Sequence, residues 1–205
     1  MVEESKHIVL AGDSIFDNDV YVMGEPGVVE QLRRSIPKDW SACKIAVDGD
    51  CIRDVEKQLE WLPTHATDLV LSVGGNDARE YRYLIDKIKA PKDIVGILSG
   101  PKAEFAAQYS SLLGRLKSLP VRLIACTIYT AIPFEEPEWR AFAPLAIGEF
   151  NKIIRLEAEK LSIPIISLEN VCTEPTDFST TSPIEPSSQG GQKIVDQIVE
   201  QIKAF

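Results

Sequence analysis

Short apolar runs alternate with amphipathic segments along this chain. The runs are rich in β-branched residues and cover residues 8–11, 43–47, 69–73, 121–126 and 163–168. Between and after them, apolar residues recur near helical spacing in segments 27–35, 54–62, 102–118, 140–161 and 187–204. This alternation predicts a parallel sheet covered by helices on both faces, with right-handed crossovers. We therefore expect an α/β fold in one domain that spans residues 1–205.

Two segments between these elements have the composition of loops. They are residues 89–100, which follow a short helical stretch at 80–88, and residues 131–137, which contain two prolines. Both come after strand ends, so they either overhang a site as lids or form plain surface loops. Phe134, Trp139 and the helix from Arg140 either line a specificity pocket there or pack on the surface.

Composition limits the classes of binding partner and the cellular compartment that we expect. The chain has 31 acidic and 22 basic residues, a net charge of -9, which disfavours nucleic acid or an anionic membrane as the main partner. The polar first residues include no secretory apolar region, and no apolar run is long enough to span a bilayer, so we expect a cytoplasmic protein. The four cysteines form no Cys-x-x-Cys pair and are expected to be reduced and mostly buried. We expect no cofactor.

The most informative motif follows the first apolar run. Residues 8–11 lead into Gly12, Asp13 and Ser14, so a turn lifts a serine hydroxyl to the carboxyl end of a buried strand. Ligands of open α/β sheets bind at that end, which makes Ser14 a candidate nucleophile. Taken alone, Gly-Asp-Ser is also compatible with a turn that carries an incidental serine.

Two further turns follow the second and third runs. Gly49 lies in an Asp-Gly-Asp turn and can present its backbone N–H to a cleft, although such turns are ordinary. Gly-Gly-Asn-Asp at residues 74–77 places Asn76, a neutral side-chain donor, after the third run; the alternative is an Asx-turn that closes the strand. If the strands lie in the order 2-1-3, Ser14, Gly49 and Asn76 converge as a nucleophile with an oxyanion hole.

With these three blocks the chain resembles the SGNH, or GDSL-like, hydrolases. Residues 12–14 match the family's nucleophile block, Gly49 matches its second-block glycine, and residues 74–77 match its Gly-x-Asn-Asp block. The resemblance implies a three-layer, flavodoxin-like sheet of order 2-1-3-4-5 and hydrolysis of a small-molecule ester or acyl substrate through an acyl-enzyme. It also implies that the oxyanion donors are the Ser14 and Gly49 N–H groups and the Asn76 side chain.

The last block of the family is altered in this chain. Members carry Asp-x-x-His-Pro-Ser before the final helix, whereas this chain has Ser182 and Glu185 at the aspartate and histidine positions. The Pro and Ser that follow Glu185 still align with the block. The actual histidines, His7 and His65, precede the first and third strands, so we expect them at the opposite edge of the sheet, roughly 15 Å from Ser14 at about 3.3 Å per strand residue.

Glu185 is therefore the candidate base. A free glutamate is a weaker base than histidine, but burial beneath the loops would raise its pKa and improve it. Ser182 could orient the carboxylate by a hydrogen bond without adding a second negative charge. Three alternatives stay open. Ser182 and Glu185 could form a capping box at the start of the last helix, or the site could be slow or inactive and only bind a ligand. The third alternative is that the acidic residues near the cleft hold a metal. We expect no metal, because the acidic spacing matches no known loop and loop capping explains it, and we expect no catalytic role for Asp17 or Asn18.

Overall fold

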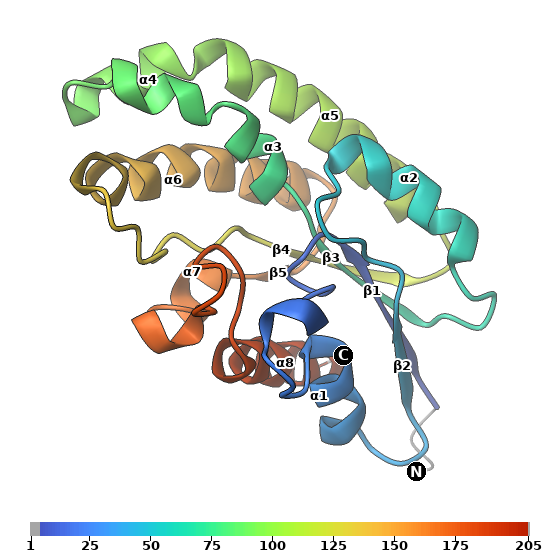
Figure 1. The fold of residues 1–205 in the computed structure, drawn as a ribbon. Helices are drawn as coiled ribbons and strands as arrows, with labels where there is room; N and C mark the ends of the chain where they lie inside the picture. The colour runs from blue at the N-terminus through green and yellow to red at the C-terminus, as the bar shows by residue number, and fades with distance from the viewer. Residues whose placement is uncertain (1–4, 205) are drawn as a thin grey trace.

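The computed structural model describes residues 5–204, and its centre is a five-stranded parallel sheet (Figure 1). The strand order is β2-β1-β3-β4-β5, with all neighbours parallel. This confirms the order 2-1-3-4-5 and the α/β class. The strands are β1 (His7–Gly12), β2 (Ser41–Lys44), β3 (Asp68–Ser72), β4 (Arg122–Cys126) and β5 (Ile165–Ile166).

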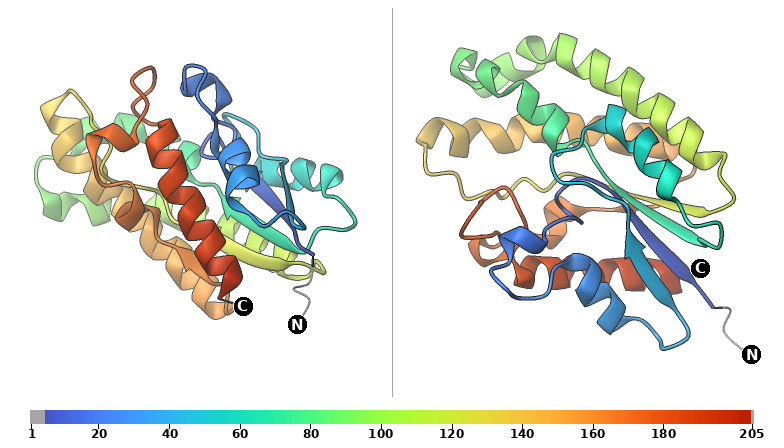
Figure 2. Two further views of the ribbon diagram at one scale, coloured as in Figure 1. Left: turned by 90° about the horizontal axis from the view of Figure 1, so that it is seen from below. Right: turned by 45° about the vertical axis from the view of Figure 1, so that its right-hand side comes forward.

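Helices cover both faces of the sheet, as Figures 1 and 2 show. On one side lie α2 (Val55–Gln58), α3 (Gly75–Glu80), α4 (Ile94–Ile97), α5 (Ser99–Lys117) and α6 (Pro137–Lys160). On the other side lie α1 (Val28–Ser35), α7 (Leu168–Val171) and α8 (Ser188–Lys203). Short 3-10 helices occupy Asp19–Tyr21, Ile52–Asp54, Leu59–Trp61, Arg82–Lys87, Pro91–Asp93 and Pro175–Asp177.

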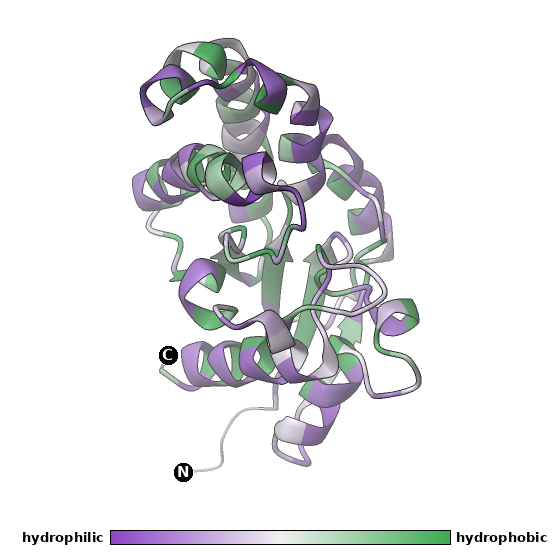
Figure 3. Cartoon of the chain, turned by 60° about the vertical axis from the view of Figure 1, so that its left-hand side comes forward, coloured by the Kyte–Doolittle hydropathy of each residue, from purple (hydrophilic) through white to green (hydrophobic). Residues whose placement is uncertain are grey.

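The alternation of side chains along the strands divides the core in two. In β1, Val9 and Ala11 pack on the side of α5 and α6, whereas Ile8 and Leu10 pack on the side of α1 and α8. All four are fully buried. A parallel strand that is covered on both faces needs such a continuous apolar run, and Figure 3 shows the strands as hydrophobic segments between mixed helices.

The second strand differs from its predicted position, 43–47. It pairs with β1 from Ser41 to Lys44 and then loses its regular ladder, because the N–H groups of Ile45 and Ala46 both donate to the Leu10 carbonyl oxygen, at 2.8 and 3.1 Å. Two donors on one acceptor form a bulge, so the regular ladder ends at Lys44, although the Val47 N–H still donates to the Gly12 carbonyl at 3.1 Å.

The prediction that residues 89–100 form a loop was wrong. The segment contains the 3-10 helix Pro91–Asp93, all of α4 and the first two residues of α5. Ile94 and Leu98 are buried in the core on the α5 side, and this burial stabilises helical turns that local composition does not predict. Residues 131–136 do form a loop, which leads into α6.

The four cysteines are unbridged, and all but the half-buried Cys43 are buried, as expected. Among residues 5–204, no helix combines the length and apolar character that crossing a membrane requires.

Candidate active site

The turn that carries Ser14 is held tightly against the next strand. Gly12 adopts φ +125°, and a Cβ there would lie 1.8 Å from the carbonyl oxygen of Ser72, so only glycine fits. The Asp13 N–H donates to the same oxygen at 3.0 Å, and the Asp13 carbonyl accepts from Phe16 at 3.1 Å. Ser14 is therefore fixed at the carboxyl end of β1, with only 6 % of its surface exposed.

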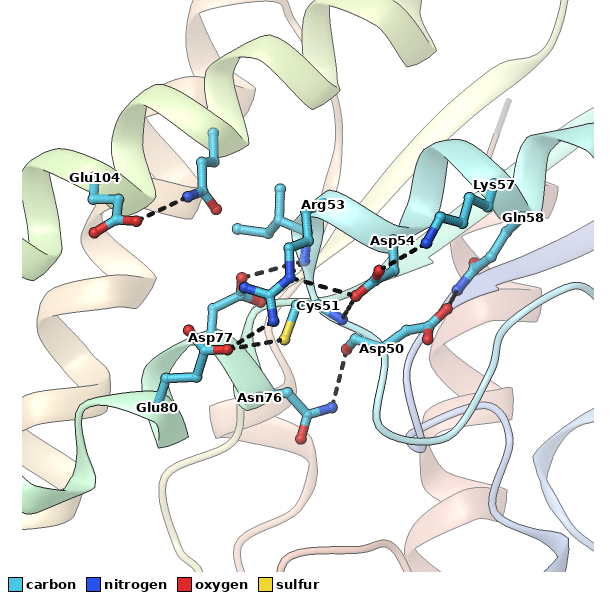
Figure 4. A network of polar contacts seen from close by, with 12 residues as sticks. Asp50, Cys51, Arg53, Asp54, Lys57, Gln58, Asn76, Asp77, Glu80 and Glu104 are labelled. Atoms are coloured by element: carbon cyan, nitrogen blue, oxygen red, sulfur yellow. Dashed lines mark hydrogen bonds and ion pairs between the residues drawn. The ribbon is translucent and has the colours of Figure 1, made fainter.

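Gln58 on α2 ties this turn to the one after β2. Its side-chain oxygen accepts from the Gly12 N–H at 2.9 Å, and its nitrogen donates to the Gly12 carbonyl and to Asp50 Oδ2, each at 2.7 Å. Gln58 is buried, and the bond to Asp50 is drawn in Figure 4. This brace was not predicted from the sequence, because it joins residues 46 positions apart.

Two of the three expected oxyanion donors are near the turn of Ser14 and have hydrogens to spare. The Ser14 N–H makes no hydrogen bond within residues 5–204. Asn76, at the second position of α3, donates one amide hydrogen to the Asp50 carbonyl at 3.0 Å (Figure 4), which leaves its other hydrogen available. Both residues line the same cavity.

Gly49 lies slightly apart from these two residues. It has φ +85° in an exposed turn after β2 and is not among the residues that line the cavity. Its part in an oxyanion hole stays a prediction.

Glu185 is held by its backbone in the loop before α8. Its N–H donates to the Ser182 carbonyl at 3.0 Å, and its carbonyl accepts from the Ser179 N–H at 2.8 Å. The buried Tyr129 hydroxyl donates to the carbonyl of Ile184, and the buried Asn18 amide donates to that of Pro186 at 3.3 Å. The loop is thus fixed from the elements on either side of it.

The capping-box alternative for Ser182 and Glu185 is wrong. Helix α8 begins at Ser188, and its N-cap is Ser187, whose hydroxyl accepts from the Gly190 N–H at 3.1 Å. Ser182 and Glu185 belong instead to the turn before this cap. The expected bond from the Ser182 hydroxyl to the Glu185 carboxylate is absent from the described structure, and the link between the two residues runs through the backbone.

The Glu185 carboxyl is buried and faces Ser14. Burial raises the pKa of Glu185 to about 7, while the nearby Ser14 hydroxyl opposes the rise. Asp48 raises this pKa further, and Arg79 lowers it. The glutamate is 5 % exposed, and its Oε2 has no hydrogen-bond partner within residues 5–204. Its proton affinity is therefore in the range usually associated with histidine.

Two other carboxyls near this point are also protonated more readily than usual. Burial raises the pKa of Asp13 well above its ordinary range, and the nearby charges of Glu185 and Asp77 add to the effect. Burial raises the pKa of Asp77 to about 6, although it accepts from the Ile52 N–H (Figure 4). Three acids of raised pKa at one end of a sheet are typical of a functional site.

A cavity of about 380 Å³ opens beside Ser14. Its volume lies within the range of small-molecule sites, about 300–1,000 Å³. Ser14, Asn76, Ser182 and Glu185 line one end of it. Apolar side chains from the helical segment after Asn76, from loop 128–134 and from α6 make the other walls: Leu84, Ile85, Ile88, Leu98, Ile128, Ile132, Phe134, Trp139, Ala143, Ala146, Ile147 and Phe150. Of the two alternatives left open for Phe134, Trp139 and this helix, the structure shows that they line the cavity.

The remaining candidates lie elsewhere. The rings of His7, the first residue of β1, and His65 are in tilted contact with their centroids 4.3 Å apart, at the opposite edge of the sheet from Ser14, as predicted. Asp17 and Asp19 both contact the Lys44 ammonium group, and Asn18 caps α1 by accepting from the Val28 N–H at 2.9 Å. Within residues 5–204, His, Cys, Asp and Glu form no group of three that could hold a metal ion.

The whole-chain comparison agrees with this geometry. The sequence pattern of the GDSL-like Lipase/Acylhydrolase family matches residues 10–193, which include Ser14, Asn76 and Glu185. The chain belongs to this family. That Glu185 stands at the position of the family's histidine base stays a prediction. A search of curated protein sequences found no match.

Several solved structures share the GDSL-like fold over almost their full length. A lipase/acylhydrolase from Enterococcus faecalis superposes with a TM-score of 0.67 at 21 % identity, over 97 % of this chain and 96 % of the other. A lipase from a goat rumen metagenome superposes with a TM-score of 0.70 at 17 % identity, over 96 % of this chain and 97 % of the other. Esterase EstA from Pseudoalteromonas sp., in a structure inhibited by monoethylphosphonate, superposes with a TM-score of 0.65 at 13 % identity, over 98 % of each chain.

Sequence reasoning missed three groups that shape this GDSL-like site. Tyr129 and Gln58 act through long-range hydrogen bonds, for which the sequence carries no signal. Arg79 could have been found, because it lies three positions after Asn76 and so shares a helix face with it.

Proposed function

We propose that the protein hydrolyses esters through Ser14, with Glu185 as the general base. The observation that carries this proposal is the buried Glu185 carboxyl, which faces Ser14, has a raised pKa and keeps one oxygen without a partner. Membership of a lipase and acylhydrolase family supports ester hydrolysis in general.

The reaction proceeds in two balanced halves. The ionised Glu185 takes the Ser14 hydroxyl proton as Ser14 Oγ attacks the ester carbonyl, and the tetrahedral intermediate then collapses as the C–O bond to the alcohol breaks. Glu185 gives its proton to the leaving alkoxide, which departs as the alcohol. In the second half, Glu185 takes a proton from water, the hydroxide attacks the acyl-serine, and the proton returns to Ser14 as the acid leaves.

The raised pKa is what lets a glutamate perform both transfers. A base must be ionised at working pH yet hold a proton strongly enough to remove it from the serine, and both conditions are met best when its pKa lies near that pH. Burial raises the pKa of Glu185 to about 7. Ser182 contributes as a positioning residue, because its carbonyl accepts from the Glu185 N–H.

The oxyanion is stabilised by groups that are already in place before substrate binds. The free Ser14 N–H and the second amide hydrogen of Asn76 are the first two donors, and Gly49 is the proposed third. The loss of one such donor typically costs about a hundredfold or more in kcat. The bond from Asn76 to the Asp50 carbonyl fixes the direction of its remaining hydrogen.

Activity and labelling together test this function. The protein should hydrolyse p-nitrophenyl hexanoate, and a fluorophosphonate probe should add one phosphonyl group to Ser14, located by mass spectrometry of the peptide. Ser14→Ala should lose both reactions, and Ser187→Ala is a matched control, because its hydroxyl caps α8 and does not line the cavity. Turnover that survives in Ser14→Ala contradicts the proposal.

A second candidate is a protein that binds esters without hydrolysing them. The missing bond between the Ser182 hydroxyl and the Glu185 carboxylate favours it, since this hydroxyl does not orient the base. The double variant Glu185→His with Ser182→Asp separates the two. If it creates activity that the parent lacks, the parent is a binding protein; if it only moves the pH profile of an existing activity, the parent is an enzyme.

A further inference from the structure

Two arginines at the cavity differ from all the others in the chain. Of the nine arginines, seven make a hydrogen bond or an ion pair with a protein group: Arg33, Arg34, Arg53, Arg115, Arg122, Arg140 and Arg155. Arg79 and Arg82 make neither within residues 5–204, and both line the cavity.

The acidic groups beside these arginines are engaged elsewhere. Glu80, between them in sequence, is paired with Arg53 at 2.8 Å (Figure 4). Glu104 accepts from the Tyr81 hydroxyl at 2.8 Å. The side chains of Arg79 and Arg82 are exposed at the edge of the cavity, and no carboxylate within residues 5–204 forms an ion pair with them, although the charge of Arg79 acts on the Glu185 carboxyl.

Their position relates them to the reacting ester. Arg79 is three residues after Asn76 on α3, and Arg82 begins the 3-10 helix that follows, three residues later again. Spacing of three in helical segments places these side chains along one side. Among the described residues that line the cavity, the charged ones are Asp13 and Glu185 beside Ser14, and these two arginines.

We propose that the substrate is an ester between an apolar acyl chain and an alcohol that bears an anionic group, and that Arg79 and Arg82 bind that group. The acyl chain fills the apolar end of the cavity, and the carbonyl lies between Ser14 and Asn76. The alcohol part then extends past Asn76 toward the exposed guanidinium groups. Carboxylate and phosphate share the required chemistry, because both accept paired N–H bonds from guanidinium.

This inference rests on the proposed ester hydrolysis for its reaction, but the binding of the anion can be measured separately. Three hexanoate esters serve as probes: those of 2-methoxyethanol, 3-hydroxypropionate and 2-hydroxyethyl phosphate, which differ in the charge of the alcohol. The kcat/KM of each is measured in the parent, in Arg79→Gln/Arg82→Gln and in Arg115→Gln. Arg115 is a matched control, because it is exposed, pairs with Glu56 at 3.2 Å and does not line the cavity.

The parent should prefer an anionic ester over the neutral one by about tenfold or more at low salt, since charge-assisted bonds are formed only with the anion. Arg79 also lowers the pKa of Glu185, so each protein is measured on the plateau of its own pH profile. There the double variant should lose this preference, and Arg115→Gln should behave as the parent. The anionic ester with the higher kcat/KM shows whether the two arginines bind a carboxylate or a phosphate. Equal rates for all three esters in the parent, or an equal loss in Arg115→Gln, overturn the inference.

A second readout separates this inference from the proposed function. The hexyl ethers of the same three alcohols cannot be hydrolysed, and their affinity is measured by calorimetry in the Ser14→Ala variant and in the same variant with both arginines replaced. Tighter binding of the anionic ethers that disappears without the arginines supports the anion site even if no ester is turned over. Hydrolysis without any preference for charge in rates or affinities rejects the site and leaves the proposed function standing.

Discussion

Two acidic residues of the loop before α8, eight positions apart, have opposite environments. Asp177 is fully buried and Glu185 is 5 % exposed. Asp177 accepts from the Thr173 and Glu174 N–H groups at 3.0 Å and pairs with Lys193 at 2.8 Å. Glu185 has no cation paired with it, and its Oε2 has no partner in the described structure.

The pKa values of the two groups differ accordingly. Burial raises the pKa of Asp177, but the bonds from Lys193 and from the backbone lower it more, so the net shift is downward. For Glu185, burial dominates, and the pKa rises to about 7. Burial alone therefore does not make a base, because a fully paired carboxylate holds the loop whereas an unpaired one is available to take a proton.

The largest expected effect is a loss of activity when Glu185 is replaced but not when Asp177 is replaced. Glu185→Gln removes the base and should lower kcat by about a hundredfold to ten-thousandfold, the usual contribution of general base catalysis. Asp177→Asn should keep the parent's activity per folded molecule. Steady-state rates with p-nitrophenyl hexanoate, normalised to folded protein by circular dichroism, check this. Equal losses in both variants would show that Glu185 only holds the loop.

The free energy of unfolding should instead fall when Asp177 is replaced. Asp177→Asn removes the ion pair with Lys193 and weakens the acceptor of the Thr173 and Glu174 N–H groups, so the free energy of unfolding should fall. Urea denaturation at pH 8 measures the loss. A variant as stable as the parent would mean that this ion pair does not fix the loop.

Glu185→Gln should instead stabilise the fold as pH rises. The folded pKa of about 7 lies above the ordinary 4.5, so between these values the folded state binds more protons than the unfolded state. The free energy of unfolding of the parent therefore falls over that window, by at most about 3.5 kcal/mol at about 1.4 kcal/mol per pH unit. The variant should match the parent at low pH and exceed it at pH 8. A constant difference across this range would contradict a raised pKa.

The smallest effect is expected at Ser182. Its contact with Glu185 is made by the carbonyl, which every residue has, so Ser182→Ala should change kcat/KM by less than about threefold, within the range of surface substitutions. Ser182→Pro is the informative comparison, since it restricts the backbone of the same turn. A large loss in Ser182→Ala would restore the hydroxyl as the group that orients the base.

The contrast between these two acids also marks what the sequence could predict. The apolar runs predicted the strands and the α/β class, and the glycine turns located Ser14 and Asn76, because both signals are local. The strand order came from the family resemblance. The family register located Glu185. Neither pattern could give its pKa, which depends on burial by residues far apart in the chain, such as Tyr129 and Asn18. The helical turns at 91–97 were missed for a related reason, since they are stabilised by packing of Ile94 rather than by local propensity.

The pH dependence of Ser14 phosphonylation tests most directly whether Glu185 is the base. The rate constant for labelling by a fluorophosphonate should rise with pH and level off above a midpoint near 7, the pKa of Glu185, in the parent and in Asp177→Asn. The groups around Glu185 that influence this midpoint are Asp48, Arg79 and Asp13. In Glu185→Gln the reaction should be slow and lack this rise. A parent rate that is flat from about pH 5 to about pH 8, or equal labelling in Glu185→Gln, would contradict the assignment.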